Sequence, residues 1–217
     1  MIYELRNYTM RPGRRDELIA LFEREFVEPQ EAVGIRVTGT FRDPDAPDTF
    51  PWVRAFPDME SRRASLEAFY GGPVWRAHRD AANATMESSD DVLLLRPAGP
   101  EFQVSERPPV GAAKAPPSSY VATVYHVTDG FAGLFARAAA PVLAEAGVPP
   151  VACFETEPAR NTFPRLPVRT GVKVFVWFAR FDTPEAEREV DLPMLAPCLT
   201  AAPVRLRLRP TARSSLR

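Results

Sequence analysis

The sequence predicts an α+β protein made of two tandem copies of one unit, whose antiparallel sheets pack against each other to form an α+β barrel. Two observations carry this prediction: aromatic and glycine positions recur in the same order in both halves, and each half has the same succession of strand and helix patterns. The repeated positions, first copy then second, are Tyr3 and Tyr120, Tyr8 and Tyr125, Phe22 and Phe135, Gly34 and Gly147, Trp52 and Trp177, and Phe56 and Phe181.

The first copy reads as strand, helix, strand, strand, helix, strand. Residues 2–10 are rich in β-branched and aromatic side chains and end at a Pro-Gly turn. Leu18, Phe22 and Phe26 are four residues apart and predict one apolar helix stripe, which we expect to end at Pro29 and Gly34. The remaining expected elements are strands over 35–42, 50–56 and 92–95, a helix capped by Asp58, and a further helix from 74 to about 87.

The second copy keeps this order with shorter connections. We expect strands over 120–127, 151–155, 171–181 and 204–209, a helix over 131–146 and a short helix near 184–188. The predicted units are therefore residues 1–97 and 118–217, joined by a proline-rich linker over 98–117. The βαββαβ order is the ferredoxin-like arrangement, which leaves one sheet face bare. Two such sheets in one chain can cover each other.

Composition excludes several classes of partner. The formal net charge of −1 gives no reason to expect nucleic acid or an anionic membrane. Cys153 and Cys198 have no metal-ligand spacing, and we expect free, partly buried thiols. No phosphate-binding or dinucleotide motif is present, so no cofactor and no metal are predicted. A cytoplasmic protein is expected because no signal peptide or long apolar run occurs.

Several motifs in the first copy resemble the NIPSNAP family. They are Tyr3-Glu-Leu-Arg-x-Tyr8, Pro12-Gly13, Phe56-Pro-x-Met-Glu-x-Arg62 and Gly72-Pro73-x-Trp75. The resemblance covers residues 1–97, and over 118–217 only the internal repeat carries it. It implies the fold of the dimeric α+β barrel group, with a homodimer as a further expectation, and no particular chemistry. Many members carry Trp in the third strand, where this chain has Arg54.

Residues found in one copy only are the better functional candidates. Arg6 corresponds to Thr123, Arg54 corresponds to Ala179, and the helix bearing Trp75 and His78 has no counterpart. His78 lies on the apolar face of that helix, where it could move a proton; the alternative is a histidine that only packs at a helix–sheet seam.

Strand alternation places Arg6 with Tyr8 on one face and Arg54 with Trp52 on one face. If these faces line the barrel interior, the two arginines would hold a carboxylate or enolate against Tyr8, Trp52 and Trp75. If the parity is reversed, Arg6 would simply pair with Glu4 at a strand edge.

Three functions remain open from the sequence. The first is binding of a small organic ligand, anionic or aromatic, in the cavity between the sheets. The second is a cofactor-independent monooxygenase or isomerase acting on an enolisable substrate, with Arg54 and Arg6 stabilising the anion and His78 moving the proton. The third is a protein-interaction module. Whether the protein is an enzyme is left open.

Overall fold

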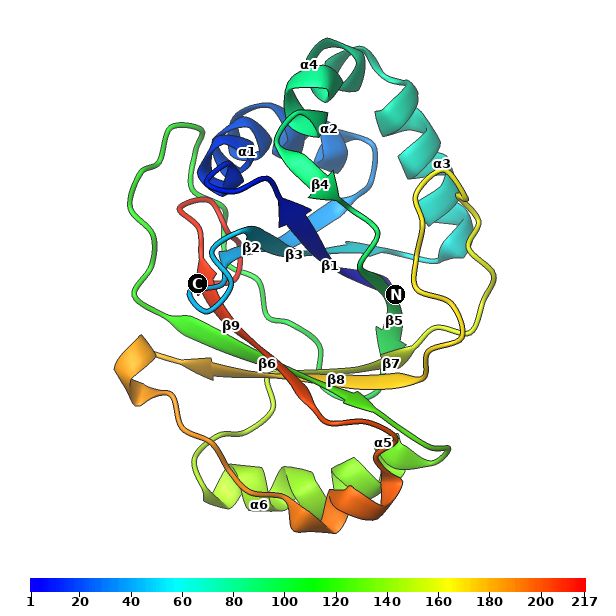
Figure 1. Cartoon of the computed structure of the whole chain (residues 1–217), viewed down its shortest axis with the longest axis vertical. Coiled ribbons are helices and arrows are strands. Elements are labelled where there is room, and N and C mark those ends of the chain that lie inside the picture. Colours follow the sequence, from blue (N-terminus) through cyan, green and yellow to red (C-terminus); the bar gives the residue numbers. More distant parts are fainter.

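A closed eight-strand barrel forms the centre of the molecule (Figure 1). The computed structural model describes the whole chain, residues 1–217. The strands follow one another around the barrel as β3-β2-β9-β6-β8-β7-β5-β1, and the β1–β3 pairing closes it. The strands are β1 (Ile2–Met10), β2 (Arg36–Arg42), β3 (Thr49–Phe56), β5 (Val92–Pro97), β6 (Ser119–His126), β7 (Ala152–Thr156), β8 (Val174–Phe181) and β9 (Val204–Pro210), while the short β4 (Met86–Ser88) adds to the end of β1.

Each half of the chain contributes a four-stranded antiparallel sheet of ferredoxin-like order. The N-terminal sheet runs β5-β1-β3-β2 and the C-terminal sheet runs β7-β8-β6-β9. Their edges join at β5–β7 and at β2–β9, which are equivalent positions in the two repeats. The predicted barrel of two tandem units is thus confirmed, and both seams close within one chain.

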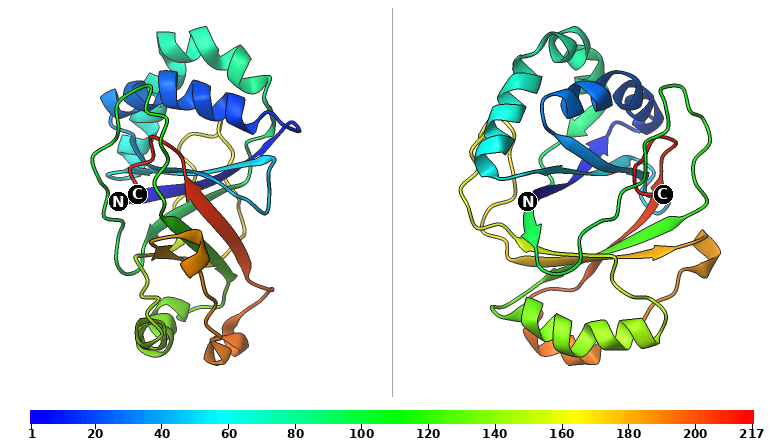
Figure 2. Two further views of the ribbon diagram at one scale, coloured as in Figure 1. Left: turned by 90° about the vertical axis from the view of Figure 1, so that its left-hand side faces the viewer. Right: turned by 180° about the vertical axis from the view of Figure 1, so that it is seen from behind.

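The helices lie outside the barrel on two opposite sides (Figures 1 and 2). One long helix in each unit follows the first strand, and the N-terminal unit adds two more. These elements are α1 (Arg15–Leu21), η1 (Phe22–Phe26), α2 (Val27–Ala32), α3 (Met59–Gly71) and α4 (Pro73–Asn83) in the N-terminal unit, and α5 (Phe131–Leu134), η2 (Phe135–Ala139), α6 (Ala140–Glu145), η3 (Pro184–Ala186) and η4 (Pro193–Cys198) in the C-terminal unit.

Of the two residues predicted to end the first helix, Pro29 lies within it, and the helix ends at Ala32, just before Gly34. A π-helical turn, η1, begins at Phe22 and widens the helix just before the proline. The wider turn removes the need for the hydrogen bond that proline cannot donate, so the helix extends to Ala32. The C-terminal unit repeats this device, since η2 begins at Phe135 and precedes Pro141.

Local signals at the next helices are confirmed in part. Asp58 caps α3, accepting a hydrogen bond from the Ser61 N–H at 2.7 Å. The following helix is shorter than predicted, because α4 ends at Asn83 and the chain turns into β4. The C-terminal unit has only two short 3₁₀ turns in place of α3 and α4.

Apolar side chains fill the barrel interior. They come from alternate positions of both sheets, while the other face of each sheet packs under its own helices. Both faces of both sheets are therefore buried. Interior residues include Leu5, Val53, Leu93, Phe154, Val176, Phe178 and Leu208.

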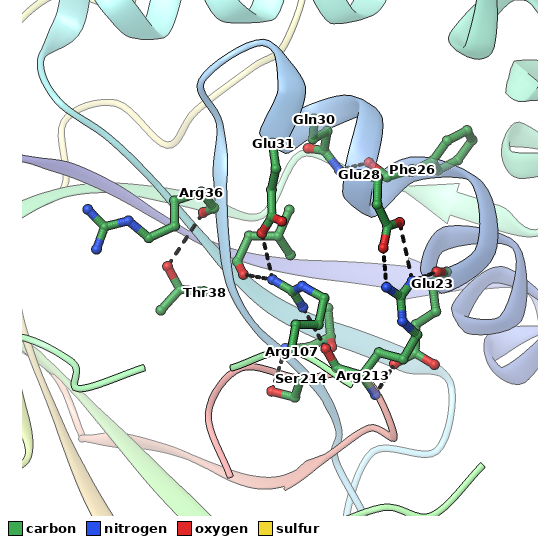
Figure 3. Close-up of polar contacts among 12 residues, drawn as sticks. Glu23, Phe26, Glu28, Gln30, Glu31, Arg36, Thr38, Arg107, Arg213 and Ser214 are labelled. Carbon is green, nitrogen blue, oxygen red and sulfur yellow. Dashed lines mark hydrogen bonds and ion pairs between the residues drawn. The ribbon is translucent and has the colours of Figure 1, made fainter. Parts of the chain in front are cut away.

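Two arginines tie the linker and the C-terminal tail to the N-terminal unit (Figure 3). Arg213, 3% exposed, binds the carboxylate of Glu28 and the carbonyl of Glu23, and its Nε donates to the Pro108 carbonyl at 3.0 Å. Arg107 donates to Glu31 Oε1 at 2.7 Å and to the Arg213 carbonyl at 2.5 Å. These contacts hold the linker and the C-terminal tail against η1 and α2. No helix has the length and apolar character needed to cross a bilayer.

Candidate functional site

Glu4 lies at the centre of a buried ion cluster between the N-terminal sheet and its helices. Its partner across the β1–β3 ladder is Arg54, and Arg6 follows two residues later on the same face of β1. Arg62 enters from the first turn of α3. Arg6 Nη1 and Arg54 Nε donate to Glu4 Oε2 at 2.6 and 2.7 Å, and Arg62 Nε donates to Glu4 Oε1 at 2.6 Å. All four side chains, called the Glu4 cluster below, are 0% exposed.

The Glu4 cluster holds three guanidinium groups and one carboxylate. Burial opposes ionisation of Glu4, yet Arg54, Arg6 and Arg62 together hold the pKa of this carboxyl well below its usual range. Each of the three guanidinium groups leaves its Nη2 buried without a hydrogen-bond partner. No second carboxylate pairs with them, so the cluster carries uncompensated positive charge and unsatisfied donors.

Two neutral side chains, Tyr8 and Gln30, connect the Glu4 cluster to a cavity by hydrogen bonds. The Tyr8 hydroxyl oxygen accepts from Arg6 Nε at 2.9 Å. Burial raises the pKa of Tyr8, with Arg6 opposing the shift, so the phenol stays protonated and its own proton is free to donate. Gln30 donates to the Phe26 carbonyl at 3.1 Å, and its Oε1 accepts from Arg54 Nη1 at 3.3 Å.

The cavity lies between the sheet and the helices and has a volume of about 90 Å³. Half of its 14 lining residues are aromatic, and its polar lining includes Tyr8, Gln30, Asn83 and Ser89. The aromatic lining residues are Tyr8, Phe22, Phe26, Trp52, Phe69, Tyr70 and Trp75.

A segment of the C-terminal unit completes this site. The β7–β8 connection, residues 157–173, reaches across to α3 (Figure 1). Asn161 Oδ1 accepts from Arg62 Nη1 at 3.0 Å, and Phe163 stacks on Tyr70 with ring centroids 5.9 Å apart. Leu166 lines the cavity. The N-terminal site therefore depends on the second unit for part of its wall.

The structure brings most of the predicted site residues together, on the face opposite to the one expected. Arg6, Arg54, Tyr8 and Trp52 share the helix-facing side of the N-terminal sheet, and Trp75 meets them from α4. The expectation that they line the space between the sheets is wrong, because apolar side chains fill that space. Arg6 does pair with Glu4, as the reversed parity predicted, although the pair is buried and shared with two more arginines.

His78 does not reach the cavity. About a third of its side chain is exposed (33%), its Nε2 lies 3.5 Å from Glu25 Oε2, and its ring packs on Phe26. It lies at the rim of the buried face of α4, and Trp75 and Ala82 occupy the positions that contact the cavity.

Sequence reasoning did not single out Arg62, Gln30 or residues 157–173 as part of the site. Arg62 was visible within the Phe56-to-Arg62 motif, and its position four residues after the Asp58 cap fixes it on the first turn of α3. Nothing in the local sequence indicates that Asn161 and Leu166 belong to the site, because their contacts span nearly 100 residues.

A larger cleft of about 910 Å³ lies beneath residues 157–173. Several of its charged side chains form ion pairs: Arg96 with Glu155 at 2.7 Å, Lys173 with Asp129, and Arg169 with Asp91, which lies outside the lining, at 3.6 Å. No lining side chain of this cleft is a buried donor without a hydrogen-bond partner, in contrast to the arginines of the Glu4 cluster. No group of three or more His, Cys, Asp or Glu side chains is placed to hold a metal ion.

Comparison with known proteins agrees with the architecture. Residues 3–99 match the family model NIPSNAP. The N-terminal unit is a NIPSNAP domain. In this NIPSNAP unit the motif residues Glu4, Arg6 and Arg62 all belong to the Glu4 cluster. No curated protein matches the chain.

Solved structures share the fold over nearly the whole chain. A candidate monooxygenase from Fusobacterium nucleatum subsp. nucleatum is similar at 10% identity and a TM-score of 0.62, covering 99% of this chain and 94% of its own. One from Lactobacillus acidophilus has 11% identity and a TM-score of 0.59, covering 96% and 93%. An anthrone oxidase-like protein has 16% identity and a TM-score of 0.60, covering 97% and 91%. At these identities the likeness is one of fold.

Proposed function

We propose that the NIPSNAP unit binds a small organic anion, whose carboxylate, phenolate or enolate oxygen accepts the hydrogen bond of Tyr8. The observation that carries the proposal is the Tyr8 hydroxyl in the cavity wall, with its oxygen held by Arg6 and its proton unused. The excess charge of the Glu4 cluster favours an anion over a neutral ligand.

The second repeat supports a functional reason for the cluster. Val121 lies opposite Ala179 where Glu4 lies opposite Arg54, and Thr123 stands in the place of Arg6. The same sheet forms there without any of these charges. Three buried arginines around one carboxylate are therefore not required by the fold, and burying them is unfavourable unless an anion balances them.

Size limits the ligand in the closed form of the site. A volume of about 90 Å³ holds roughly three waters at about 30 Å³ each, and a cavity of about 150 Å³ is known to take benzene. A small acid fits without rearrangement, whereas a ring requires Trp75 to move outward. Trp75 is half-buried on α4, next to the Gly71-Gly72 turn that joins α4 to α3.

The test compares acids with neutral molecules of the same shape. We expect acetate to bind more tightly than acetamide, and benzoate more tightly than benzamide, as measured by calorimetry and by the rise in melting temperature on binding. Tyr8→Phe should weaken acetate binding about 10- to 100-fold, as expected for loss of a hydrogen bond to a charged group. Tyr120→Phe makes the same change inside the barrel and should leave binding unchanged. Equal affinity for acid and amide, or no effect of Tyr8→Phe, would rule the proposal out.

Oxygenation or isomerisation of an enolisable substrate is the second candidate, favoured by the same anion-stabilising hydroxyl and by the names of the similar structures. It also requires a base, and the cavity lining offers no carboxylate or histidine. Oxygen uptake in the presence of anthrone tests it. Turnover that Tyr8→Phe abolishes would establish the enzyme; anion binding without turnover would leave a binding protein.

Under the binding proposal, His78→Ala should not change affinity. The exposed large apolar residues are few and are spread along the sequence: Met1, Val104, Val110, Met194 and Val204. They give no support to the third candidate, a protein-interaction module.

A further inference from the structure

The C-terminal unit contains a cavity on the face that corresponds to the Glu4 cluster. Thr123 lies opposite Trp177 in the same register in which Arg6 lies opposite Trp52. The C-terminal cavity is lined by Val121, Thr123, Tyr125, Trp177 and Ala179 and has a volume of about 440 Å³. Its counterpart in the NIPSNAP unit measures about 90 Å³.

Two differences between the repeats create this space. Arginines are replaced by Thr123 and Ala179, whose side chains end well short of the helical layer. The helices α3 and α4 are replaced by an irregular roof, residues 182–203, which runs beside α6 beneath the C-terminal sheet (Figures 1 and 2).

The roof is attached at several points, so the cavity is preformed. Arg188 Nη2 donates to the carbonyls of Ala146 and Gly147, both at 2.9 Å, where the helix α6 ends. Arg205 pairs with Glu189 at 2.8 Å. Leu195, 1% exposed, anchors the other end of the roof in the apolar core.

Four exposed charged side chains line the outer side of this cavity, two of each sign: Arg188, Glu189, Asp191 and Arg205. Arg205 pairs with Glu189, and Arg188 is bound to the end of α6. The uncharged polar residues of the lining are Thr123, Tyr125 and Trp177.

Trp177 Nε1 is buried and faces the Tyr125 hydroxyl without meeting the geometry of a hydrogen bond, and an indole N–H can only donate. Tyr125 adds a phenolic hydroxyl, and burial raises its pKa, so it is also a donor at neutral pH. The remaining inner wall, including Val121, Ala179 and Leu195, is apolar. Such a lining suits a hydrophobic body that carries one hydrogen-bond acceptor.

We infer that the C-terminal cavity is a second ligand site, which takes a flat, uncharged aromatic molecule with a carbonyl oxygen directed at Trp177 and Tyr125. The volume of 440 Å³ lies within the range of about 300–1,000 Å³ found for small-molecule sites. The two repeats then divide binding by charge, with the anion in the first unit and the neutral ring system in the second.

A pair of probes that differ only in the acceptor tests this site. The probes are 9-fluorenone and fluorene, the same tricyclic body with and without the carbonyl oxygen, measured by equilibrium dialysis against the full chain. We expect saturable binding of both, about tenfold tighter for fluorenone. Removing both donors, in a variant with Trp177→Phe and Tyr125→Phe, should abolish the preference for fluorenone over fluorene.

A second set of variants locates the probe. Ala179→Phe fills the cavity and should abolish binding of both probes. Ala186→Phe makes the same change at an exposed position outside the cavity and should have no effect. If Ala179→Phe does not fold, Val190→Trp fills the cavity from the half-buried roof and should give the same loss. Absence of saturable binding, or binding that survives both filling variants, would overturn the inference.

Discussion

Glu4 lies directly opposite Arg54 on the β1–β3 ladder, and the Arg54 Nε donates to Glu4 Oε2 at 2.7 Å with both side chains fully buried. Arg6 and Arg62 share the same carboxylate. One carboxylate thus binds three buried guanidinium groups. Removing it should therefore cost more stability than removing an acidic group at the surface.

Replacing Glu4 by Gln should destabilise the protein by about 3 to 5 kcal/mol, because three guanidinium groups stay buried without their anion. Urea unfolding at pH 7 measures the change. Glu17→Gln, which breaks the exposed pair with Arg14, should have little effect. A Glu4→Gln protein as stable as the wild type would show that the cluster contributes nothing to stability.

The Glu4 contribution should also depend on pH. The folded-state pKa of Glu4 is depressed below the unfolded value of about 4.3. Its contribution is therefore complete above about pH 4.3 and is lost as the pH falls from there toward the folded-state pKa. The stability difference between wild type and Glu4→Gln should be constant between pH 5 and 7 and shrink below pH 4. A difference that stays constant down to pH 3 would contradict the assignment.

Replacing the whole cluster by apolar residues should keep the fold. We expect a variant with Glu4→Leu, Arg6→Met, Arg54→Met and Arg62→Met to be about as stable as wild type or more stable, because no charge remains buried. The same variant should not bind acetate. Circular dichroism and melting temperature check the first expectation, and calorimetry checks the second. A folded variant that still binds acetate would separate anion binding from the cluster.

Arg213 should be a strong determinant of the packing between the two units. Its guanidinium is 3% exposed and binds Glu28, Glu23 and Pro108 at once. Arg213→Ala should destabilise the protein by about 1 to 3 kcal/mol, since the carbonyls of Glu23 and Pro108 lose their donor, whereas the Glu28 carboxylate is exposed and contributes little. Denaturant unfolding measures this, and Arg217→Ala, at the partly buried end of the same tail, serves as the control. Equal effects of the two variants would mean that Arg213 has no special role.

The two thiols should differ sharply in reactivity. Burial raises the pKa of Cys153 to about 12, so almost no thiolate exists at pH 8. Cys198 is only partly buried, on the roof of the C-terminal cavity. Iodoacetamide at pH 8 followed by peptide mass spectrometry should therefore modify Cys198 alone, and Cys198→Ser should leave the folded protein unreactive. Rapid labelling of Cys153 in the native state would contradict its burial.

Much of the fold was accessible from the sequence. The repeated pairs Tyr8 and Tyr125, and Trp52 and Trp177, indicated two units, and the structure gives each pair the same register. The candidate site was half accessible. Strand alternation correctly grouped Arg6 with Tyr8, but it could not place His78 at the rim of α4 or bring Asn161 to Arg62.

The amino-acid sequence alone determined the presence of two repeats, the order of elements within a repeat and the residues that share a strand face, because these follow from local periodicity and from internal repetition. Only the tertiary structure decided which face Glu4, Arg6 and Arg54 occupy. In a barrel covered by helices both faces of each sheet are buried, so the sequence shows no contrast between a solvent-exposed face and a buried face from which the orientation of the strands could be predicted. The side on which three arginines gather around one carboxylate is then set by which layer offers room for long side chains, and that depends on contacts across the whole chain.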